Sequence, residues 1–471
     1  MSRPNALFLL TDQERYDLTE PGSPVETPNL DRLSEDGMAF ERAYTPISIC
    51  SSARASLLTG LYPHNHGMLN NCHEADAIRP NLPPELPTFG ELLAEAGYVN
   101  RYVGKWHVGR DQGPEDFGFE YRGGADRHHD PGLAGDFERY REELGVDVDE
   151  GDLEDLEDRI HTGTGTLVAA TDPAPVEATR PYYIAERAIE CLRGETDEPF
   201  FLRTDLYGPH HPYVVPEPYA SMYDPEAIER PGSYAETFEG KPAVHERYLR
   251  YRGADALDWE TWSEAIAKYR GFMTLLDDQV GRILDALDEG DLEDTLVVHA
   301  SDHGDFTGGH RQFNKGPLMY EDTYRIPLQI RWPGEVESGS TCREFVSLHD
   351  LMPTFLDLAD AEIPDVDGRS IRPLLDGGVP ADWREAHFAQ YHGDEFGLYS
   401  QRMLRTKRYK YVHNGPDRNE LYDLESDPHE LTNLIEHPDY EDARGDLERR
   451  LLERMRETDD PLSQWAGDVL G

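Results

Sequence analysis

The chain has 471 residues, of which 94 are acidic and 45 basic, and its formal net charge is -49. This charge excludes nucleic acids and anionic membranes as natural partners, because both would be repelled. The length permits a large core and two or three domains. Only six of the basic residues are lysines, and we interpret the acidic, arginine-rich composition as a halophilic adaptation to concentrated salt, which screens the self-repulsion.

Predicted strands and helices alternate up to Gly377. Short apolar runs predict strands at 5–10, 98–103, 200–206, 295–300, 328–331 and 345–348. Capping residues and three- or four-residue apolar spacing predict helices that start at Thr27-Pro28 and at Thr88, and others at 186–193 and 259–287. This alternation predicts an α/β fold with a large, mostly parallel or mixed sheet sandwiched by helices.

The pattern changes after Gly377, where 387–391, 401–406 and 409–413 resemble antiparallel strands and a charged helix follows near 440–457. We therefore predict a catalytic α/β domain over residues 1–376 and a smaller α+β domain with an antiparallel sheet over 377–471. Two irregular segments, 126–174 and 217–257, are predicted to be surface excursions that carry the substrate specificity.

The four cysteines are irregularly spaced and match neither a zinc-binding nor a disulfide pattern; they are Cys50, Cys72, Cys191 and Cys342. A reducing compartment is the default for such a chain. The first strand is predicted within a few residues of Met1, without a signal peptide or a membrane-spanning apolar run. These features predict a cytoplasmic protein.

Ionisable side chains follow four of the predicted strands. They are Asp12, then Lys105 and His107, then His210, and finally Asp302 and His303. Because ligands of open α/β sheets bind beyond the carboxyl ends of the strands, we expect these side chains to converge. Two carboxylates, Asp12 and Asp302, suit a divalent cation.

The segment Cys50–Gly60 places Cys50 and Arg54 one turn apart at the start of a short helix, for which Ser51 or Ser52 is the expected cap. A helix N-terminus and a forked arginine together favour a sulfate or phosphate anion. A lone cysteine in this place is, by itself, more often a small buried apolar residue.

The pattern C-x-x-x-R-x-x-x-L-T-G in this segment resembles the signature of the type I sulfatases, in the alkaline phosphatase superfamily, and matching pieces run from Asn5 to Asn433. The usual signature has proline at the position of Ser52 and commonly serine at that of Ala53. The resemblance implies an alkaline-phosphatase-like fold and hydrolysis of sulfate monoesters. It also implies that a formylglycine-generating enzyme converts Cys50 to formylglycine, whose hydrate, held by the metal, attacks sulfur and forms a covalent sulfated intermediate.

The same resemblance implies one divalent metal, with calcium as the expected ion. The implied ligands are Asp12, Gln13, Cys50 as formylglycine, Asp302 and His303. Gln13 and His303 stand where many sulfatases have aspartate and asparagine, and they resemble the phosphonate monoester hydrolase branch. An imidazole ligand suits Mn²⁺ or Zn²⁺ better than calcium.

Further roles follow from the resemblance. Arg54, Lys105 in G-K-W-H and Lys315 in N-K-G-P are expected to neutralise sulfate oxygens in catalysis. His107 is expected to deprotonate the hydrate, and His210 in P-H-x-P to protonate the leaving oxygen. The expected substrate-binding residues are Asn71, His211 and His310. His211 is the alternative to His210 for the role in P-H-x-P. For His310 the alternative is a structural role in a turn.

The leading hypothesis is a hydrolase of small-molecule or carbohydrate sulfate esters; carbohydrate, aryl and choline-like esters all fit. The nearest alternative is a phosphonate monoester or phosphodiester hydrolase on the same scaffold. A third, motivated by Ser52 and Ala53, is a non-catalytic anion-binding homologue with an unmodified Cys50. The sequence carries no signal for an oligomeric state.

Overall fold

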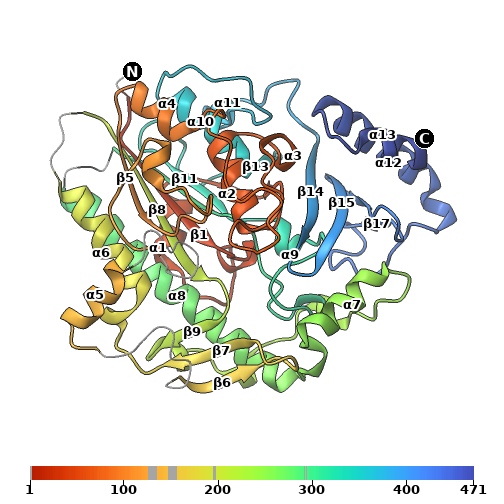
Figure 1. Ribbon diagram of the computed structural model, residues 1–471, viewed down its shortest axis with the longest axis horizontal. Helices are drawn as coiled ribbons and strands as arrows, with labels where there is room; N and C mark the ends of the chain where they lie inside the picture. Colours follow the sequence, from red (N-terminus) through yellow and green to blue (C-terminus); the bar gives the residue numbers. More distant parts are fainter. Residues whose placement is uncertain are drawn as a thin grey trace.

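A computed structural model describes residues 3–125, 135–146, 156–194, 198–290, 292 and 294–470. Its centre is an eight-stranded sheet in the order β12-β2-β11-β10-β1-β8-β4-β5 (Figure 1). The strands are β1 (Ala6–Asp12), β2 (Met38–Phe40), β4 (Val99–Gly104), β5 (Glu120–Tyr121), β8 (Phe200–Pro209), β10 (Leu296–Ser301), β11 (Leu328–Arg331) and β12 (Ser340–Cys342). Strands β10, β1, β8, β4 and β5 are parallel, whereas β11 is antiparallel to β10 and β2. The sheet is therefore mixed.

The central strand β1 is buried on both faces. Its side chains alternate between two cores, with Phe8 and Leu10 in one and Leu7 and Leu9 in the other. The first core is completed by α2 (Cys50–Thr59), α4 (Phe89–Glu95) and α10 (Leu351–Leu358), and the second by α1 (Pro28–Glu35), α6 (Arg180–Arg193) and α8 (Trp259–Glu289). Burial on both faces is why the strand is a continuous apolar run, and it confirms the predicted sandwich.

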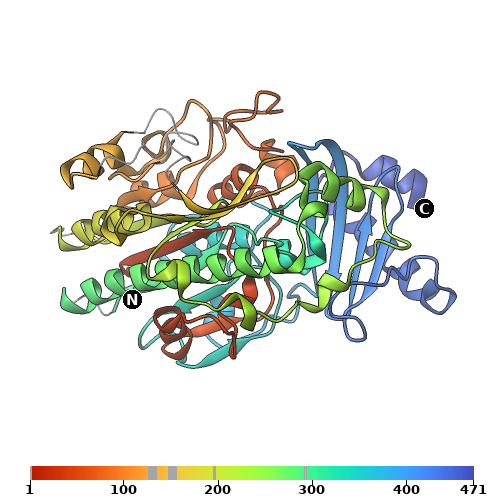
Figure 2. The same ribbon diagram turned by 90° about the horizontal axis from the view of Figure 1, so that it is seen from below.

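The C-terminal part forms a separate antiparallel sheet in the order β14-β15-β16-β17. The strands are β14 (Ala386–Asp394), β15 (Gly397–Thr406), β16 (Tyr409–His413) and β17 (Glu420–Asp423), and α12 (Glu441–Glu457) and α13 (Ser463–Leu470) follow. Figures 1 and 2 show this sheet beside the large one, with the two helices on its outer side. The antiparallel sheet is confirmed; β17 and α13 were not predicted, and the domain division after residue 376 stays a prediction.

The two predicted excursions contain more regular structure than expected. A small sheet joins β6 (Glu157–His161), β7 (Leu167–Asp172) and β9 (Tyr213–Pro216), and α7 (Ala243–Arg252) lies in the second excursion. β7 is largely buried, so this part of the first excursion packs into the body of the protein. Residues 126–134 and 147–155 of that excursion lie outside the described residues. No helix in the described part of the chain is both long and apolar enough to cross a membrane.

Gly104 ends β4 with a φ of 97°, and a Cβ there would lie 1.9 Å from the backbone oxygen of Asp205. We expect Gly104→Ala to lower the free energy of unfolding by about 2 kcal/mol or more, because two strands would be forced apart. Gly445, within α12, has no atom within 4 Å of such a Cβ. Gly445→Ala is the matched control and should raise stability by about 0.5–1 kcal/mol. Denaturant unfolding in concentrated salt measures both, and equal stabilities of the Gly104 variant and the parent would contradict this account.

Candidate active site

Residues far apart in the sequence meet at the carboxyl edge of the large sheet. Asp12 ends β1 and Asp302 directly follows β10, its parallel neighbour. Asp12, Cys50, Asp302 and His303 are all buried, and each offers a ligand atom within 4.8 Å of the others. The structure thus brings together four of the five predicted metal-ligating residues in one buried cluster, which we call the Cys50 cluster.

Cys50 is the first residue of α2, and its thiol faces this cluster. Its Sγ lies 3.2 Å from Nε2 of His303 and 3.8 Å from Oδ1 of Asp12. Burial raises the pKa of Cys50 to about 11, although Lys105 and Lys315 favour the thiolate. The thiol is therefore protonated at neutral pH and is a poor nucleophile in its own right.

The N-terminus of α2 is held differently from the sequence-based expectation. The helix begins at Cys50 and is preceded by Ile49, which has no capping group, so neither Ser51 nor Ser52 is the cap. The Ser51 hydroxyl instead accepts a hydrogen bond from the backbone N–H of Cys72 (3.1 Å). Oδ1 of Asn71 accepts from the backbone N–H of Ser51 (3.2 Å), so Asn71 supplies the capping oxygen from a neighbouring loop.

Arg54 and Lys105 compensate the two carboxylates. Nε of Arg54 donates to Asp302 (2.9 Å) and Nη1 to Asp205 (2.7 Å), while Nζ of Lys105 donates to Asp12 (2.6 Å). Burial opposes the ionisation of Asp12, but these cations outweigh it and hold the pKa of Asp12 well below its ordinary value. Burial and the charge of Asp12 raise the pKa of Asp302. The fully buried Asp205 is held in turn by Arg203 and by the Tyr102 hydroxyl.

His303 is oriented as a metal ligand would be. Its Nδ1 donates to the backbone oxygen of Gly304 (2.9 Å), so the lone pair of Nε2 points toward Cys50. Burial, helped by Lys315, holds the pKa of His303 well below its ordinary value, so the ring is neutral. A neutral imidazole fixed through its other nitrogen, beside two carboxylates, fits a divalent cation.

Gln13 has a left-handed backbone conformation, with a φ of 66°. Its backbone N–H donates to Oδ1 of Asp302 (3.1 Å). Its side-chain oxygen accepts from Nζ of Lys315 (2.7 Å), and its side-chain nitrogen donates to Asp305. Gln13 therefore links Lys315 to the sheet edge, and its role as a metal ligand stays a prediction.

The remaining predicted catalytic residues lie around this core. Nζ of Lys315 is 3.3 Å from Nε2 of His210, and the His210 ring stacks on that of His211 with centroids 4.5 Å apart. Nε2 of His107 is 2.8 Å from Nδ1 of His73. Both His210 and His211 are half-buried, so this side of the cluster has access to solvent.

His310 lies in a different cluster from the other predicted residues. It is buried, with Nδ1 2.9 Å from Glu236 and its ring stacked on Tyr320 at 3.6 Å between centroids. These contacts agree with the alternative that it is structural. The loop histidines His64 and His66 likewise bond within the fold, to the backbone oxygen of Thr458 and to Ser56. His128, His129 and Asp130 lie outside the described residues.

Several polar residues of the site were not predicted: Asp205, His73, Asp305 and Asp394. Asp394, on β14, accepts from the side-chain amide of Asn71 at 3.1 Å and so ties the C-terminal sheet to the start of α2. Asp205 carried a sequence signal, because Arg203 and Asp205 are two residues apart in a buried strand, and such residues share one face. The others sit in loops or in a distant sheet.

The architecture is alkaline-phosphatase-like, and the buried cluster offers four side chains that could hold a metal ion. A family model described as Sulfatase matches residues 4–361, and a second, N-sulphoglucosamine sulphohydrolase, C-terminal, matches residues 308–457. The chain therefore belongs to the sulfatase family, in the alkaline phosphatase superfamily, and by that membership it is a sulfuric ester hydrolase.

Individual relatives cover almost the whole chain. The multifunctional alkaline phosphatase superfamily protein PehA of Trinickia caryophylli is 32% identical, covering 100% of this chain and 99% of PehA. The arylsulfatase of Clostridium perfringens is 31% identical, covering 96% of this chain and 94% of its own length. Among solved structures, the phosphonate monoester hydrolase SpPMH from Silicibacter pomeroyi matches with a TM-score of 0.83 and 26% identity, covering 98% of this chain and 97% of that one.

The Asp205→Asn variant tests whether Asp205 positions Arg54 for catalysis in addition to stabilising the fold. Removing this buried charge leaves Arg54 and Arg203 without their shared carboxylate, and we expect the free energy of unfolding to fall by about 3 kcal/mol or more. In the protein that remains folded, displacement of Arg54 should lower kcat about a hundredfold with a small change in KM. The control is Asp382→Asn, at a surface carboxylate that pairs with Arg369 at 3.0 Å, which should change neither quantity. Full activity of the Asp205 variant would contradict this assignment.

Proposed function

We propose that the protein hydrolyses sulfate monoesters by using a formylglycine at position 50 as the nucleophile, through a covalent sulfated intermediate. The observation that carries the proposal is the meeting of Asp12, Asp302 and His303 around Cys50, with ligand atoms within 4.8 Å. The neutral, buried thiol is a poor nucleophile, and oxidation to an aldehyde hydrate would supply an oxygen nucleophile in its place.

The modifying enzyme would act before the chain folds. All ten residues of α2 are buried, so the signature segment is inaccessible in the folded protein. We propose a formylglycine-generating enzyme as the partner that reads this segment. Ser52 and Ala53 depart from the usual signature, and both are fully buried.

We propose one divalent cation, held by Asp12, Asp302, His303 and the oxygen of residue 50. A bound cation would lower the pKa of the nucleophile and offset charge on the substrate. Calcium is expected from the family resemblance, but the His303 nitrogen beside only two carboxylates favours Mn²⁺ or Zn²⁺.

Three cations would receive the sulfate group. Nη2 of Arg54 makes no hydrogen bond to any described residue, although the other nitrogens of its guanidinium are engaged, and it lies 3.9 Å from Oδ1 of Asp12, so it faces the Cys50 cluster. Lys105 and Lys315 are buried beside the Cys50 cluster. Burial lowers the pKa of each, but Cys50, Asp12 and Asp302 together raise it above its ordinary value, so both stay charged. Fixed positive charge in a buried site stabilises the negative charge that develops as the S–O bond breaks.

Two histidine groups would move the protons. Lys315 and His210 are within hydrogen-bond distance of one another (3.3 Å), and this pair would protonate the leaving alcohol. His107 would take the proton of the hydrate and pass it to His73 (2.8 Å), whose other nitrogen lies 3.2 Å from Glu74. The side chains of His73 and Glu74 are 26% and 25% exposed, so this path ends at solvent.

The substrate would be a small-molecule or carbohydrate sulfate ester. A phosphonate monoester or phosphodiester is the second candidate, because Gln13 and His303 resemble the phosphonate hydrolase branch and SpPMH has a closely similar fold. The same cations suit either anion. Steady-state rates on an aryl sulfate and on the matching aryl phosphonate monoester separate the two, and we expect the larger kcat/KM for the sulfate.

The test of the nucleophile is the mass of the peptide that contains residue 50, in protein from a host with the modifying enzyme. We expect the aldehyde, and we expect Cys50→Ala to fold normally but to lose turnover. An intact thiol in fully active protein would contradict the formylglycine mechanism. An intact thiol in protein that binds sulfate without turnover would support the non-catalytic alternative.

The test of the metal site is Asp302→Ala. This variant should lose bound metal and activity together, because Asp302 is one of only two carboxylates in the Cys50 cluster. Elemental analysis of dialysed protein gives the metal content per chain, with Asp382→Ala as the surface control. Unchanged metal content in the Asp302 variant would contradict the ligand assignment.

A further inference from the structure

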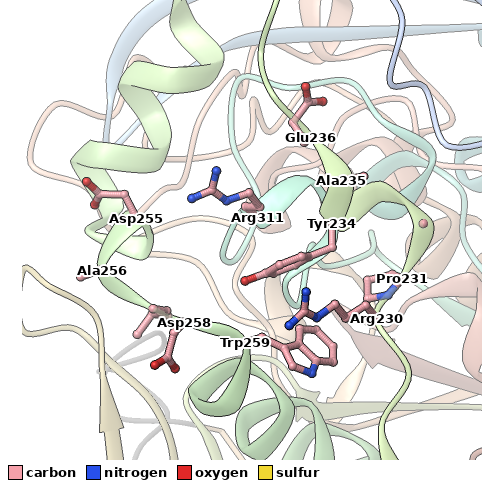
Figure 3. Close-up of a pocket in the computed structure, with 12 residues that line it drawn as sticks. Arg230, Pro231, Tyr234, Ala235, Glu236, Asp255, Ala256, Asp258, Trp259 and Arg311 are labelled. Atoms are coloured by element: carbon pink, nitrogen blue, oxygen red, sulfur yellow. The ribbon is translucent and has the colours of Figure 1, made fainter.

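A cavity lined by none of the residues of the Cys50 cluster lies between residues 230–236, residues 255–258 and the start of α8 (Figure 3). Its volume is ≈ 730 Å³, within the range of about 300–1,000 Å³ that is usual for small-ligand sites. Its walls include two aromatic residues, Tyr234 and Trp259, and two arginines, Arg230 and Arg311. We call this the arginine cavity.

The two arginines are not engaged with carboxylates. The guanidinium of Arg311 has no hydrogen-bond or ion-pair partner among the described residues, although acidic residues outnumber basic ones by 94 to 45. Arg230 lies over the rings of Trp259 and Tyr234, 5.3 and 5.7 Å from their centroids, and also lacks a carboxylate partner in the described part of the chain. In Figure 3 the Arg311 guanidinium and the Tyr234 ring extend into the open space between the walls.

The acidic residues of the cavity do not cancel this charge. Glu236 is bound to Lys241 and to His310, and these contacts, against burial, hold its pKa at about 2. Asp258 accepts from the backbone N–H of Thr261 (3.0 Å) as the cap of α8. Asp255 is exposed at the rim, and Figure 3 shows its carboxylate turned away from Arg311.

The backbone at Arg311 is also unusual. Arg311 has a φ of 60°, and His310 before it has a φ of 48°. Non-glycine residues in this region cost free energy, and they persist where the surrounding structure fixes a side chain in a required direction. Here the turn carries Arg311, whose side chain lines the cavity.

We infer that the arginine cavity binds an acidic sugar ring, so that the substrate is an anionic oligosaccharide with one sulfate at Cys50 and a second acidic sugar here. Arginines pair with a sulfate or carboxylate group, and aromatic side chains pack against the apolar face of a sugar. The carboxylate of Asp255, at the rim, would accept hydrogen bonds from the sugar hydroxyl groups. Tyr234 and Trp259 meet edge to face at 5.1 Å and form no parallel slot for a flat base, which disfavours a nucleotide. The oligosaccharide assignment rests on the proposed sulfatase function.

The chain brings one wall of the cavity near a residue of the active site. Arg311 is four residues before Lys315, which contacts His210 in the active site. Four residues span at most about 14 Å when fully extended, so the Cα atoms of Arg311 and Lys315 lie no farther apart than that. An oligosaccharide of a few rings can bridge such a distance, whereas an aryl sulfate occupies only the Cys50 cluster.

The experiment measures binding of a panel of tetrasaccharides from heparin, chondroitin sulfate and dermatan sulfate. Calorimetric titration uses full-length protein with Cys50→Ala, to prevent turnover, at one fixed salt concentration. Arg311→Gln and Arg230→Gln are each compared with Arg343→Gln, a control at an exposed arginine that pairs with Glu41 (3.1 Å) outside the cavity. Inorganic sulfate and ATP are the reference ligands.

We expect at least one tetrasaccharide to bind, and each cavity variant to weaken it about tenfold or more through loss of a charge-assisted contact. Affinity for inorganic sulfate should not change, and the control should match the parent. Failure of all tetrasaccharides to bind, equal affinities in cavity and control variants, or tighter binding of ATP would overturn the inference.

Failure of the inference and failure of the proposed function give different results. Turnover of an aryl sulfate by the unsubstituted protein, without Arg311-dependent tetrasaccharide binding, would overturn the cavity assignment alone. Arg311-dependent binding in a protein that cleaves no sulfate ester would overturn the proposed function and leave an acidic-sugar site.

Discussion

The site depends on the compensation of two like charges buried at one edge of the sheet. Asp12 and Asp302 are fully buried, and leaving both without partners would cost several kcal/mol for each ion. Lys105 donates to Asp12 and Arg54 to Asp302, and Asp205 fixes the far side of Arg54. This ion network keeps the two carboxylates together beside Cys50, which is the arrangement that a divalent cation requires.

The fold was largely predictable because its central strands are buried on both faces. The apolar runs in β1, β8 and β10 identify strands without reference to tertiary contacts. The four-residue β17 is short, and β7 pairs with β9, more than 40 positions later. Short strands and distant partners leave little local signal, which is why these elements escaped prediction. The start of α2 was misassigned because its capping oxygen comes from Asn71, in another loop.

The candidate site was predictable where an ionisable residue stands at the end of a predicted strand, as at Asp12, Lys105 and Asp302. The scarcity of lysine was a useful but incomplete guide. Five of the six lysines are buried: Lys105, Lys241, Lys268, Lys315 and Lys410. Lys241 and Lys410 form buried ion pairs with Glu236 and Glu430 outside the Cys50 cluster. The scarcity of lysine therefore indicates buried charged residues rather than catalytic ones. Asp205 and His73 contact the site through other residues. The spacing of Asp205 from Arg203 was a sequence signal, whereas the contact of His73 with His107 is visible only in the structure.

The central claim is that one metal ion joins Asp12, Asp302, His303 and residue 50. Anomalous X-ray diffraction from crystals of the metal-loaded protein, collected on both sides of the absorption edge of the metal, locates that ion directly. The account predicts one strong peak with all four side chains at about 2.0–2.6 Å. A stoichiometric metal that lies elsewhere, or a peak without contact to Asp12 and Asp302, would contradict it.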